Sequence, residues 1–156
     1  MSGMHVVVAT DGSKQSLAAA RHLRSFADPT ALSQVTVLAV VRPLAAVSFV
    51  DDLTEGRRAS TETEVAGFRA AAKAATESVA AVFDGWGPKV RRAVRSGSPA
   101  NEIIKVAEQT SAGLVVVAAG GRGLSERVLL GSTAQRVQQY APCPVLVVRP
   151  APRRRR

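Results

Sequence analysis

Continuous apolar segments alternate along the chain with segments of helical periodicity. Apolar runs over residues 4–10, 35–41, 114–119 and 145–148 are typical of buried strands. A fifth strand is expected over 89–95, where valines alternate with basic residues as in an edge strand with one buried face. Because helical segments separate the strands, the pattern predicts one α/β domain: a doubly wound, five-stranded parallel sheet with helices on both faces.

The helical segments carry apolar residues at three- and four-residue spacing. The first is expected over 14–26, after the capping turn Asp11-Gly12-Ser13 and before Asp28-Pro29. The others are expected over 60–83, from the cap Ser98-Pro99 to residue 109, and over 132–140. The apolar stripe of the second helix comprises Val65, Phe68, Ala72, Val79 and Val82.

The connection between the second strand and the second helix, over 42–60, is long for a compact domain. It contains an apolar piece over 44–50, followed by Asp51 and Asp52. It is interpreted either as a flap over a site or as a partly ordered surface segment, and the pattern favours neither.

In a doubly wound sheet, ligands bind beyond the carboxyl ends of the strands, where the strand order reverses. Two loops there suit a ligand, the segments 10–13 and 120–123. Glycines let backbone N–H groups approach an anion, and a helix starting near Gly131 adds its positive end and two hydroxyl groups. Arg122 and Arg127 are candidates to neutralise phosphate charge. Any tight turn can require glycines, so the combination of the two loops indicates the site.

Several classes of enzyme are disfavoured by missing motifs. No Gly-Lys-Ser or Gly-Lys-Thr follows the glycines, as a P-loop would require, and neither Gly-x-Ser-x-Gly nor a metalloprotease histidine motif occurs. His5 and His22 are interpreted as ordinary surface or packing residues, and Cys143 as a buried structural thiol. We therefore predict no catalytic residue and no metal site.

Composition and charge add a preference for anionic partners. Aromatic residues make up only 4% of the chain, so aliphatic side chains must fill its interior. The 21 Lys and Arg exceed the 12 Asp and Glu, and the formal net charge is +9. Residues 151–156 are expected to form a disordered basic tail, with nucleic acid or another polyanion as the alternative contact of Arg153 to Arg156. No run approaches the roughly 18 apolar residues of a membrane span, so a soluble, cytoplasmic protein is expected.

Three segments resemble the universal stress protein family: Val-Val-Val-Ala-Thr-Asp-Gly-Ser at 6–13, Gly-Ser-Pro-Ala at 97–100, and Ala-Pro-Cys-Pro-Val-Leu-Val-Val at 141–148. The likeness extends to Arg149. It implies one domain over 1–150 with the adenine nucleotide alpha hydrolase-like fold and the strand order 3-2-1-4-5. Nucleotide-binding members hold ATP. By this resemblance the adenosine end is lined by Ala9, Thr10, Asp11 and Val40, and the phosphates by Gly120, Gly123, Gly131, Ser132 and Thr133.

Two departures from the family pattern bear on the ligand. The family loop has nine residues between its second and third glycines, but only residues 124–130 separate Gly123 from Gly131, so two are missing. Gly113 stands where members often carry Asp before the fourth strand. Asp11 is interpreted either as a helix cap alone or as a cap that also contacts the ligand.

The resemblance implies a stress-response regulatory protein that binds ATP or another adenine nucleotide, with or without Mg²⁺, and hydrolyses ATP slowly at most. The alternative is a scaffold or signalling protein of the same fold that has lost nucleotide binding. Either form is expected to be a homodimer through Val145–Val148, an apolar strand at a sheet edge, and to act on a protein partner that the sequence does not identify. A ligase-type enzyme is a more distant hypothesis, because the Ser-Gly-Gly-x-Asp-Ser loop of ATP pyrophosphatases is not reproduced at 10–14.

Overall fold

The structure, a computed structural model, describes residues 3–43, 55–120 and 130–150. Strands and helices alternate along this part of the chain, as the hydrophobic pattern predicts. The strands are β1 (Met4–Thr10), β2 (Leu32–Val41), β3 (Lys89–Ser96), β4 (Leu114–Ala118) and β5 (Val145–Val148). The helices are α1 (Lys14–Phe26), α2 (Glu55–Ala81), α3 (Pro99–Gln109) and α4 (Ser132–Tyr140), with a 3-10 turn, η1 (Pro29–Ala31), before β2.

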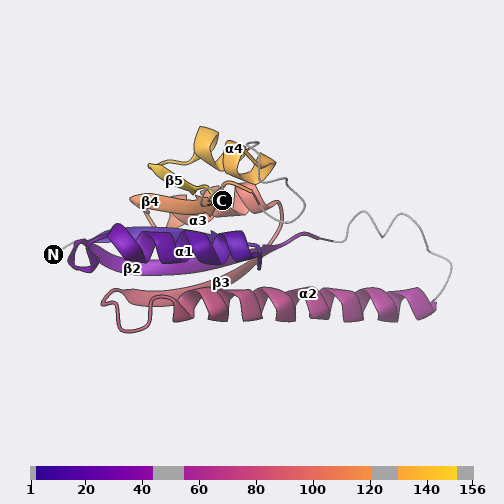
Figure 1. The fold of residues 1–156 in the computed structure, drawn as a ribbon. Coiled ribbons are helices and arrows are strands. Elements are labelled where there is room, and N and C mark those ends of the chain that lie inside the picture. Colours follow the sequence, from indigo (N-terminus) through magenta and orange to yellow (C-terminus); the bar gives the residue numbers. More distant parts are fainter. Residues whose placement is uncertain (1–2, 44–54, 121–129, 151–156) are drawn as a thin grey trace, which may run out of the picture.

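The five strands form one parallel sheet in the order β3-β2-β1-β4-β5. Helices α1 and α2 cover one face and helices α3 and α4 cover the other (Figure 1). This arrangement confirms the predicted fold class. The strand order reverses between β1 and β4, so the carboxyl ends of these two strands mark the place where a ligand is expected.

The two neighbours of β1 pair with it over different lengths. The register with β2 runs along the whole strand, from Met4 to Thr10. The register with β4 covers only Val6 to Val8, although β1 continues to Thr10 and β4 to Ala118. The pairing of β1 with β4 therefore ends before the carboxyl ends of the two strands, where the strand order reverses.

Two apolar cores lie on the two faces of the sheet, because successive side chains of a strand point in opposite directions. Val7 and Leu38 face α3 and α4, and Val6 and Val8 face α1 and α2. Nearly all the largest fully buried side chains are Val or Leu, and Phe83 is the aromatic exception. The structure confirms an interior filled by aliphatic side chains.

The starts of β2 and α2 differ from the prediction. The turn η1 reverses the chain after Asp28, whose carboxylate accepts hydrogen bonds from the backbone N–H and hydroxyl of Thr30, so β2 begins three residues earlier than expected. These hydrogen bonds lower the pKa of Asp28 below its ordinary value. Helix α2 begins at Glu55 rather than residue 60, so the expected connection over 42–60 is shorter. Its segment 44–54, with both interpretations of it, lies outside the described residues.

The predicted apolar stripe of α2 is wrong only at Phe68, since Val65, Ala72 and Val82 are half-buried. Val79 is buried, with 2% of its surface exposed, whereas Phe68 is 50% exposed. A helix of 27 residues is about 40 Å long, but the eight-residue β3 that it accompanies spans only about 27 Å. The amino-terminal part of α2 therefore extends past the sheet (Figure 1).

Strand β3 is an edge strand, as expected, but it does not have one fully buried face. Val90 packs toward α1 and α2, whereas Ala93 packs toward the other core. Val94, on the same face as Val90, is 36% exposed. Arg92 forms an ion pair with Glu77 of α2 at 3.0 Å, so a charged side chain occupies part of the face that the alternation assigned to the core.

Gly113, the departure just before the fourth strand, has a packing explanation. A Cβ atom at this position would lie 2.7 Å from Cγ of Met4. The Gly113 backbone N–H also donates to the carbonyl of His5 at 2.9 Å, so the chain passes close to the start of β1. A side chain at position 113 would require Met4 to move.

Among the described helices, none is long and apolar enough to cross a membrane.

Candidate functional site

The loop after β1 is a compact hydrogen-bonded turn. Gly12 has a φ of +80°, a conformation that glycine adopts without strain. Ser13 is the N-cap of α1, because its hydroxyl accepts a hydrogen bond from the Ser16 backbone N–H at 3.1 Å. The carboxylate of Asp11 accepts from the Ser13 backbone N–H at 2.9 Å. Asp11 therefore shapes the turn before the helix, and the cap itself is Ser13.

The side chain of Thr10 is satisfied inside this loop. The Ser16 hydroxyl donates to the carbonyl of Ser13 at 2.8 Å, so in its 2.8 Å contact with Thr10 it accepts the Thr10 proton. The Thr10 oxygen also accepts from the Gly12 backbone N–H at 3.1 Å. Thr10 is buried, whereas Asp11 is exposed. The Thr10 hydroxyl therefore has no proton left to donate to a ligand, while the carboxylate of Asp11 is accessible.

The ends of the glycine loop after β4 are held together. The Gly131 backbone N–H donates to the carbonyl of Ala119 at 2.7 Å, which places the start of α4 beside Gly120. The Gln135 side chain donates to the carbonyl of Leu130 at 2.8 Å. Gly120, Gly131, Ser132 and Thr133 therefore belong to one region. Gly123, Arg122 and Arg127 lie outside the described residues.

Beside this region, a groove of about 430 Å³ opens at the carboxyl ends of β2 and β3. The Gly97 backbone N–H donates to the carbonyl of Val41 at 3.0 Å, which joins the turn before α3 to the end of β2. Helices α3 and α4 both begin at the groove. We call it the strand-end groove; it is lined by Arg42, Pro43, Gly97, Ser98, Pro99, Ala100, Ser132, Thr133 and Arg136.

The amino-terminal ends of α3 and α4 are not capped by side chains. Ser98 occupies the predicted N-cap position of α3, but its hydroxyl makes no capping hydrogen bond. The N-cap of α4 is Gly131, which has no side chain to accept one. The first backbone N–H groups of a helix have no partner within the helix, and the helix dipole makes this end positive. Both helix ends therefore favour an anion in the strand-end groove.

The predicted site residues are only partly gathered in this groove. Ser132 and Thr133 line it. Ala9 and Val40 are half-buried near the ends of β1 and β2, and their side chains pack against the core beneath α3 and α4. Thr10 and Asp11 belong to the turn that leads to α1 on the other face. The eight predicted residues that the structure describes thus lie along the carboxyl edge of the sheet, and the two in the groove are at its α4 side.

Among the polar and charged lining residues, three were not predicted as site residues: Arg42, Ser98 and Arg136. Ser98 was assigned only a capping role, and Arg42 was placed in a connection. A signal for Arg136 exists, because it follows Ser132 by four residues and Thr133 by three within a predicted helix. Residues at these spacings share one face of a helix. No comparable local signal relates Arg42 or Ser98 to α4.

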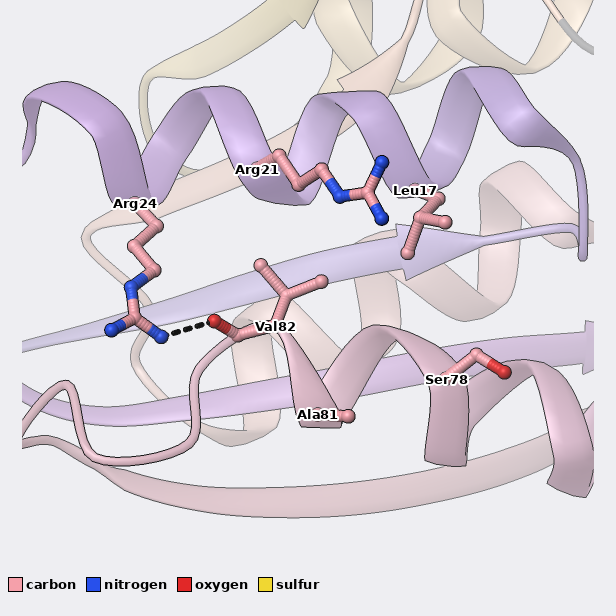
Figure 2. A pocket seen from close by; sticks show the side chains of 6 residues that line it. All are labelled: Leu17, Arg21, Arg24, Ser78, Ala81 and Val82. Carbon is pink, nitrogen blue, oxygen red and sulfur yellow. Dashed lines mark hydrogen bonds between the residues drawn. The ribbon is translucent and has the colours of Figure 1, made fainter.

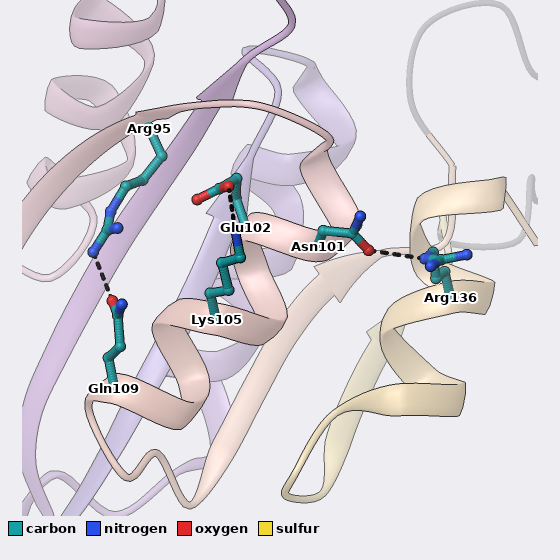
Figure 3. A network of polar contacts seen from close by, with 6 residues as sticks. All are labelled: Arg95, Asn101, Glu102, Lys105, Gln109 and Arg136. Atoms are coloured by element: carbon teal, nitrogen blue, oxygen red, sulfur yellow. Dashed lines mark hydrogen bonds and ion pairs between the residues drawn. The ribbon is translucent and has the colours of Figure 1, made fainter.

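The charge around the groove is mainly positive. Within the described part of the chain, the lining includes two arginines and no carboxylate. Arg136 donates from Nε to the Oδ1 atom of Asn101 in α3 at 3.0 Å (Figure 3). Its guanidinium carbon lies 5.4 Å from the centre of the Tyr140 ring. Glu102 lies behind Gly97 and pairs with Lys105 at 3.4 Å. The carboxylate of Glu102 is therefore matched by its own cation.

Two other candidate reactive side chains have pKa values shifted by burial. Cys143 is half-buried against the core of α3 and α4, and burial raises the pKa of its thiol above the ordinary value. His5 contacts the Thr36 hydroxyl at 2.7 Å, and burial together with Arg91 lowers the pKa of its ring. Both shifts favour the neutral form. These geometries agree with the packing roles that the sequence analysis assigned to them.

A parallel sheet in the order β3-β2-β1-β4-β5, with loops from β1 and β4 at the reversal point, defines a doubly wound α/β protein of the adenine nucleotide alpha hydrolase-like class. The sequence profile of the Universal stress protein family matches residues 4–149. A universal stress protein of Methanocaldococcus jannaschii is 37% identical over 145 residues, which cover 92% of this chain and 81% of that protein. The chain belongs to the universal stress protein family.

Solved structures agree with this assignment at the level of the fold. The universal stress protein UspA from Lactobacillus plantarum superposes with a TM-score of 0.76 at 24% identity, covering 96% of this chain and 99% of that one. A universal stress protein in complex with cAMP has a TM-score of 0.62 at 21% identity, covering 97% and 100%. A family protein from Arabidopsis thaliana with AMP bound has a TM-score of 0.65 at 17% identity, covering 95% and 92%.

Proposed function

We propose that this protein is a stress-response regulator that binds an adenine nucleotide along the carboxyl edge of its sheet. The observation that carries the proposal is the strand-end groove, in which the uncapped start of α4 meets two arginines. A volume of about 430 Å³ is within the range of small-molecule sites. Structural neighbours with cAMP and AMP support the same class of ligand.

In the proposed orientation, adenosine lies toward the ends of β1 and β2, near Ala9, Asp11 and Val40. The phosphates lie toward Gly120 and the start of α4, where Ser132 and Thr133 add hydroxyl groups to the backbone N–H groups. The family resemblance implies a phosphate contact for Gly123 as well, which lies outside the described residues. Thr10 contributes its backbone, because its hydroxyl is engaged within the loop.

A scaffold that has lost nucleotide binding is the second candidate, and the short glycine loop favours it. Two residues are missing between Gly123 and Gly131, and the hydrogen bond from Gly131 to Ala119 fixes the end of the loop. A shorter loop offers fewer backbone N–H groups at the terminal phosphate. We therefore expect modest nucleotide affinity, with less than about a tenfold gain from AMP to ATP.

Calorimetry with adenosine, AMP, ADP and ATP, with and without Mg²⁺, tests this proposal. Binding of adenosine and AMP with little further gain toward ATP is the expected result. A steep rise toward ATP would show that the short loop still surrounds all the phosphates. If none of the four ligands binds, the scaffold is the better description.

We further propose a homodimer through β5. This strand lies at the edge of the sheet, pairs with β4 on one side, and consists of four half-buried apolar residues, Val145–Val148. A bare apolar edge strand tends to pair with another chain. Light scattering of the unmodified protein over a range of concentrations should give the dimer mass. A monomer at high micromolar concentration would contradict this proposal.

A further inference from the structure

Arg136 is held in a defined orientation at the mouth of the strand-end groove. It lies on α4 one turn after Ser132, and its Nε atom donates to Oδ1 of Asn101 on the neighbouring α3. The guanidinium carbon lies over the ring of Tyr140 at 5.4 Å from the centroid. These two contacts restrict a side chain that would otherwise lose much rotamer freedom on binding a ligand.

This orientation presents one particular edge of the guanidinium group. A guanidinium has five N–H donors arranged as a planar fork. With Nε engaged by Asn101, the two terminal amino groups are the donors that remain as a pair (Figure 3). Paired amino groups of arginine match two oxygens of a phosphate and bind them with charge-assisted hydrogen bonds.

The surroundings of Arg136 select for an anion. Arg42 adds a second positive charge to the same lining, and the starts of α3 and α4 add their positive dipole ends. The described lining contains no carboxylate that would compete with a ligand for the guanidinium, and Glu102 behind Gly97 is paired with Lys105. These positive charges would not increase the affinity for a neutral ligand such as adenosine, but they would increase the affinity for a phosphate dianion.

We propose that Arg136 is a specificity-determining residue that binds the phosphate of a nucleoside monophosphate, and that Asn101 is the positioning residue that orients it. This inference rests on the proposed function for the identity of the nucleotide. It goes beyond that function because it assigns phosphate recognition to an arginine of α4 outside the short glycine loop. The loop then contributes little to the first phosphate.

The experiment compares Arg136→Gln, Arg136→Lys and Asn101→Ala with the unmodified protein. Each is titrated by calorimetry with adenosine, AMP and inorganic pyrophosphate. Arg136→Gln should lower the affinity for AMP and for pyrophosphate by about tenfold or more. Its affinity for adenosine should be unchanged, because only the phosphate contacts are lost. Arg136→Lys should recover part of the loss, since it keeps the charge without the fork. Asn101→Ala should lower the affinity for AMP by about threefold and leave the affinity for adenosine unchanged.

Arg21→Gln is the matched control, because Arg21 is an exposed arginine on α1 that lines a different groove. It should change none of the three affinities. An equal loss of adenosine and AMP in Arg136→Gln would show a merely structural role and overturn the inference. So would pyrophosphate binding that is unchanged in Arg136→Gln or absent from the unmodified protein. If pyrophosphate binding depends on Arg136 but neither AMP nor adenosine binds, the phosphate-binding role of Arg136 holds and the adenine-nucleotide proposal fails.

Discussion

Two grooves on this protein are each lined by two arginines, and they differ in what those arginines contact. The larger, of about 500 Å³, lies between α1 and α2 and is lined by Leu17, Arg21, Arg24, Ser78, Ala81 and Val82 (Figure 2). There Arg24 donates from Nη1 to the backbone carbonyls of Val82 and Asp84. In the smaller strand-end groove, Arg136 donates to a side chain, Asn101, at the place where two helices begin.

The difference indicates that the polarity of the nearby helix ends, more than the size of the groove, distinguishes an arginine that stabilises the fold from one that is available to a ligand. The carbonyls that follow α2 are at its negative end, and a cation there satisfies the helix itself. The starts of α3 and α4 are positive, so they repel a nearby arginine unless an anion binds between the arginine and the helix ends. We therefore expect Arg24 to serve stability and Arg136 to serve a ligand, although the first groove is the larger.

The largest effect should follow from Gly97→Ala, which distorts only the strand-end groove. Gly97 has a φ of +147°, a region that residues with a side chain rarely adopt, and a Cβ atom there would lie 2.9 Å from Oε1 of Glu102. The strain and the clash should lower the free energy of unfolding by about 2–3 kcal/mol. Urea unfolding measures this loss, and AMP affinity should fall as well.

Gly67→Ala is the control for that substitution. Gly67 lies in the exposed part of α2, with no atom within 4 Å of the position of an added Cβ. Alanine in a helix interior is more stable than glycine by about 0.5–1 kcal/mol, so this variant should be slightly stabilised. If Gly97→Ala were equally harmless, the turn at Gly97 would not need glycine.

A smaller effect is expected from Arg24→Ala in the α1–α2 groove. The variant loses two charge-assisted hydrogen bonds to carbonyls at the end of α2, partly compensated by water because Arg24 is only half-buried. The free energy of unfolding should fall by about 1–2 kcal/mol, with AMP affinity unchanged. Arg21→Ala, in the same groove, should change stability by less than about 0.5 kcal/mol. Weaker AMP binding by Arg24→Ala would contradict the distinction between the grooves.

The smallest effect is expected from removing the third group of arginines, Arg153 to Arg156, which lies outside the described residues. Four like charges after two prolines are not expected to pack, so the melting temperature should stay nearly constant. AMP affinity at physiological salt should also be unchanged, because salt screens exposed charges. Shorter retention of the truncated protein on heparin would assign the tail to polyanions. A lower melting temperature would show that it packs on the domain.

Most of the fold could be predicted, because the signals for strands and helices are local. The bounds of β1, α1, α4 and β5 agree with the hydrophobic pattern. The errors lie where packing between distant segments decides the outcome. Phe68 fits the apolar stripe of α2, but it is exposed because the helix is longer than the strands it accompanies.

The candidate site was predictable only in part. The turn from Ala9 to Ser13 and the start of α4 were predicted as parts of the site because loops after parallel strands and glycines before a helix have recognisable residues. Asp11 was assigned to the helix cap, but the hydrogen bonds give that role to Ser13. Arg42 and Ser98 were missed because nothing in their own segments relates them to α4.

Local order along the chain was thus enough to establish the α/β class and, through three short motifs, the family. The periodicity of a strand or helix, and the residues that end it, depend on about ten neighbouring positions in the sequence. They can therefore be recognised without knowing the fold. The strand-end groove arises from parallel pairing, which brings the carboxyl ends of β2 and β3 to one edge, and from the packing of α3 beside α4. Asn101 and Arg136 are 35 residues apart and meet only there.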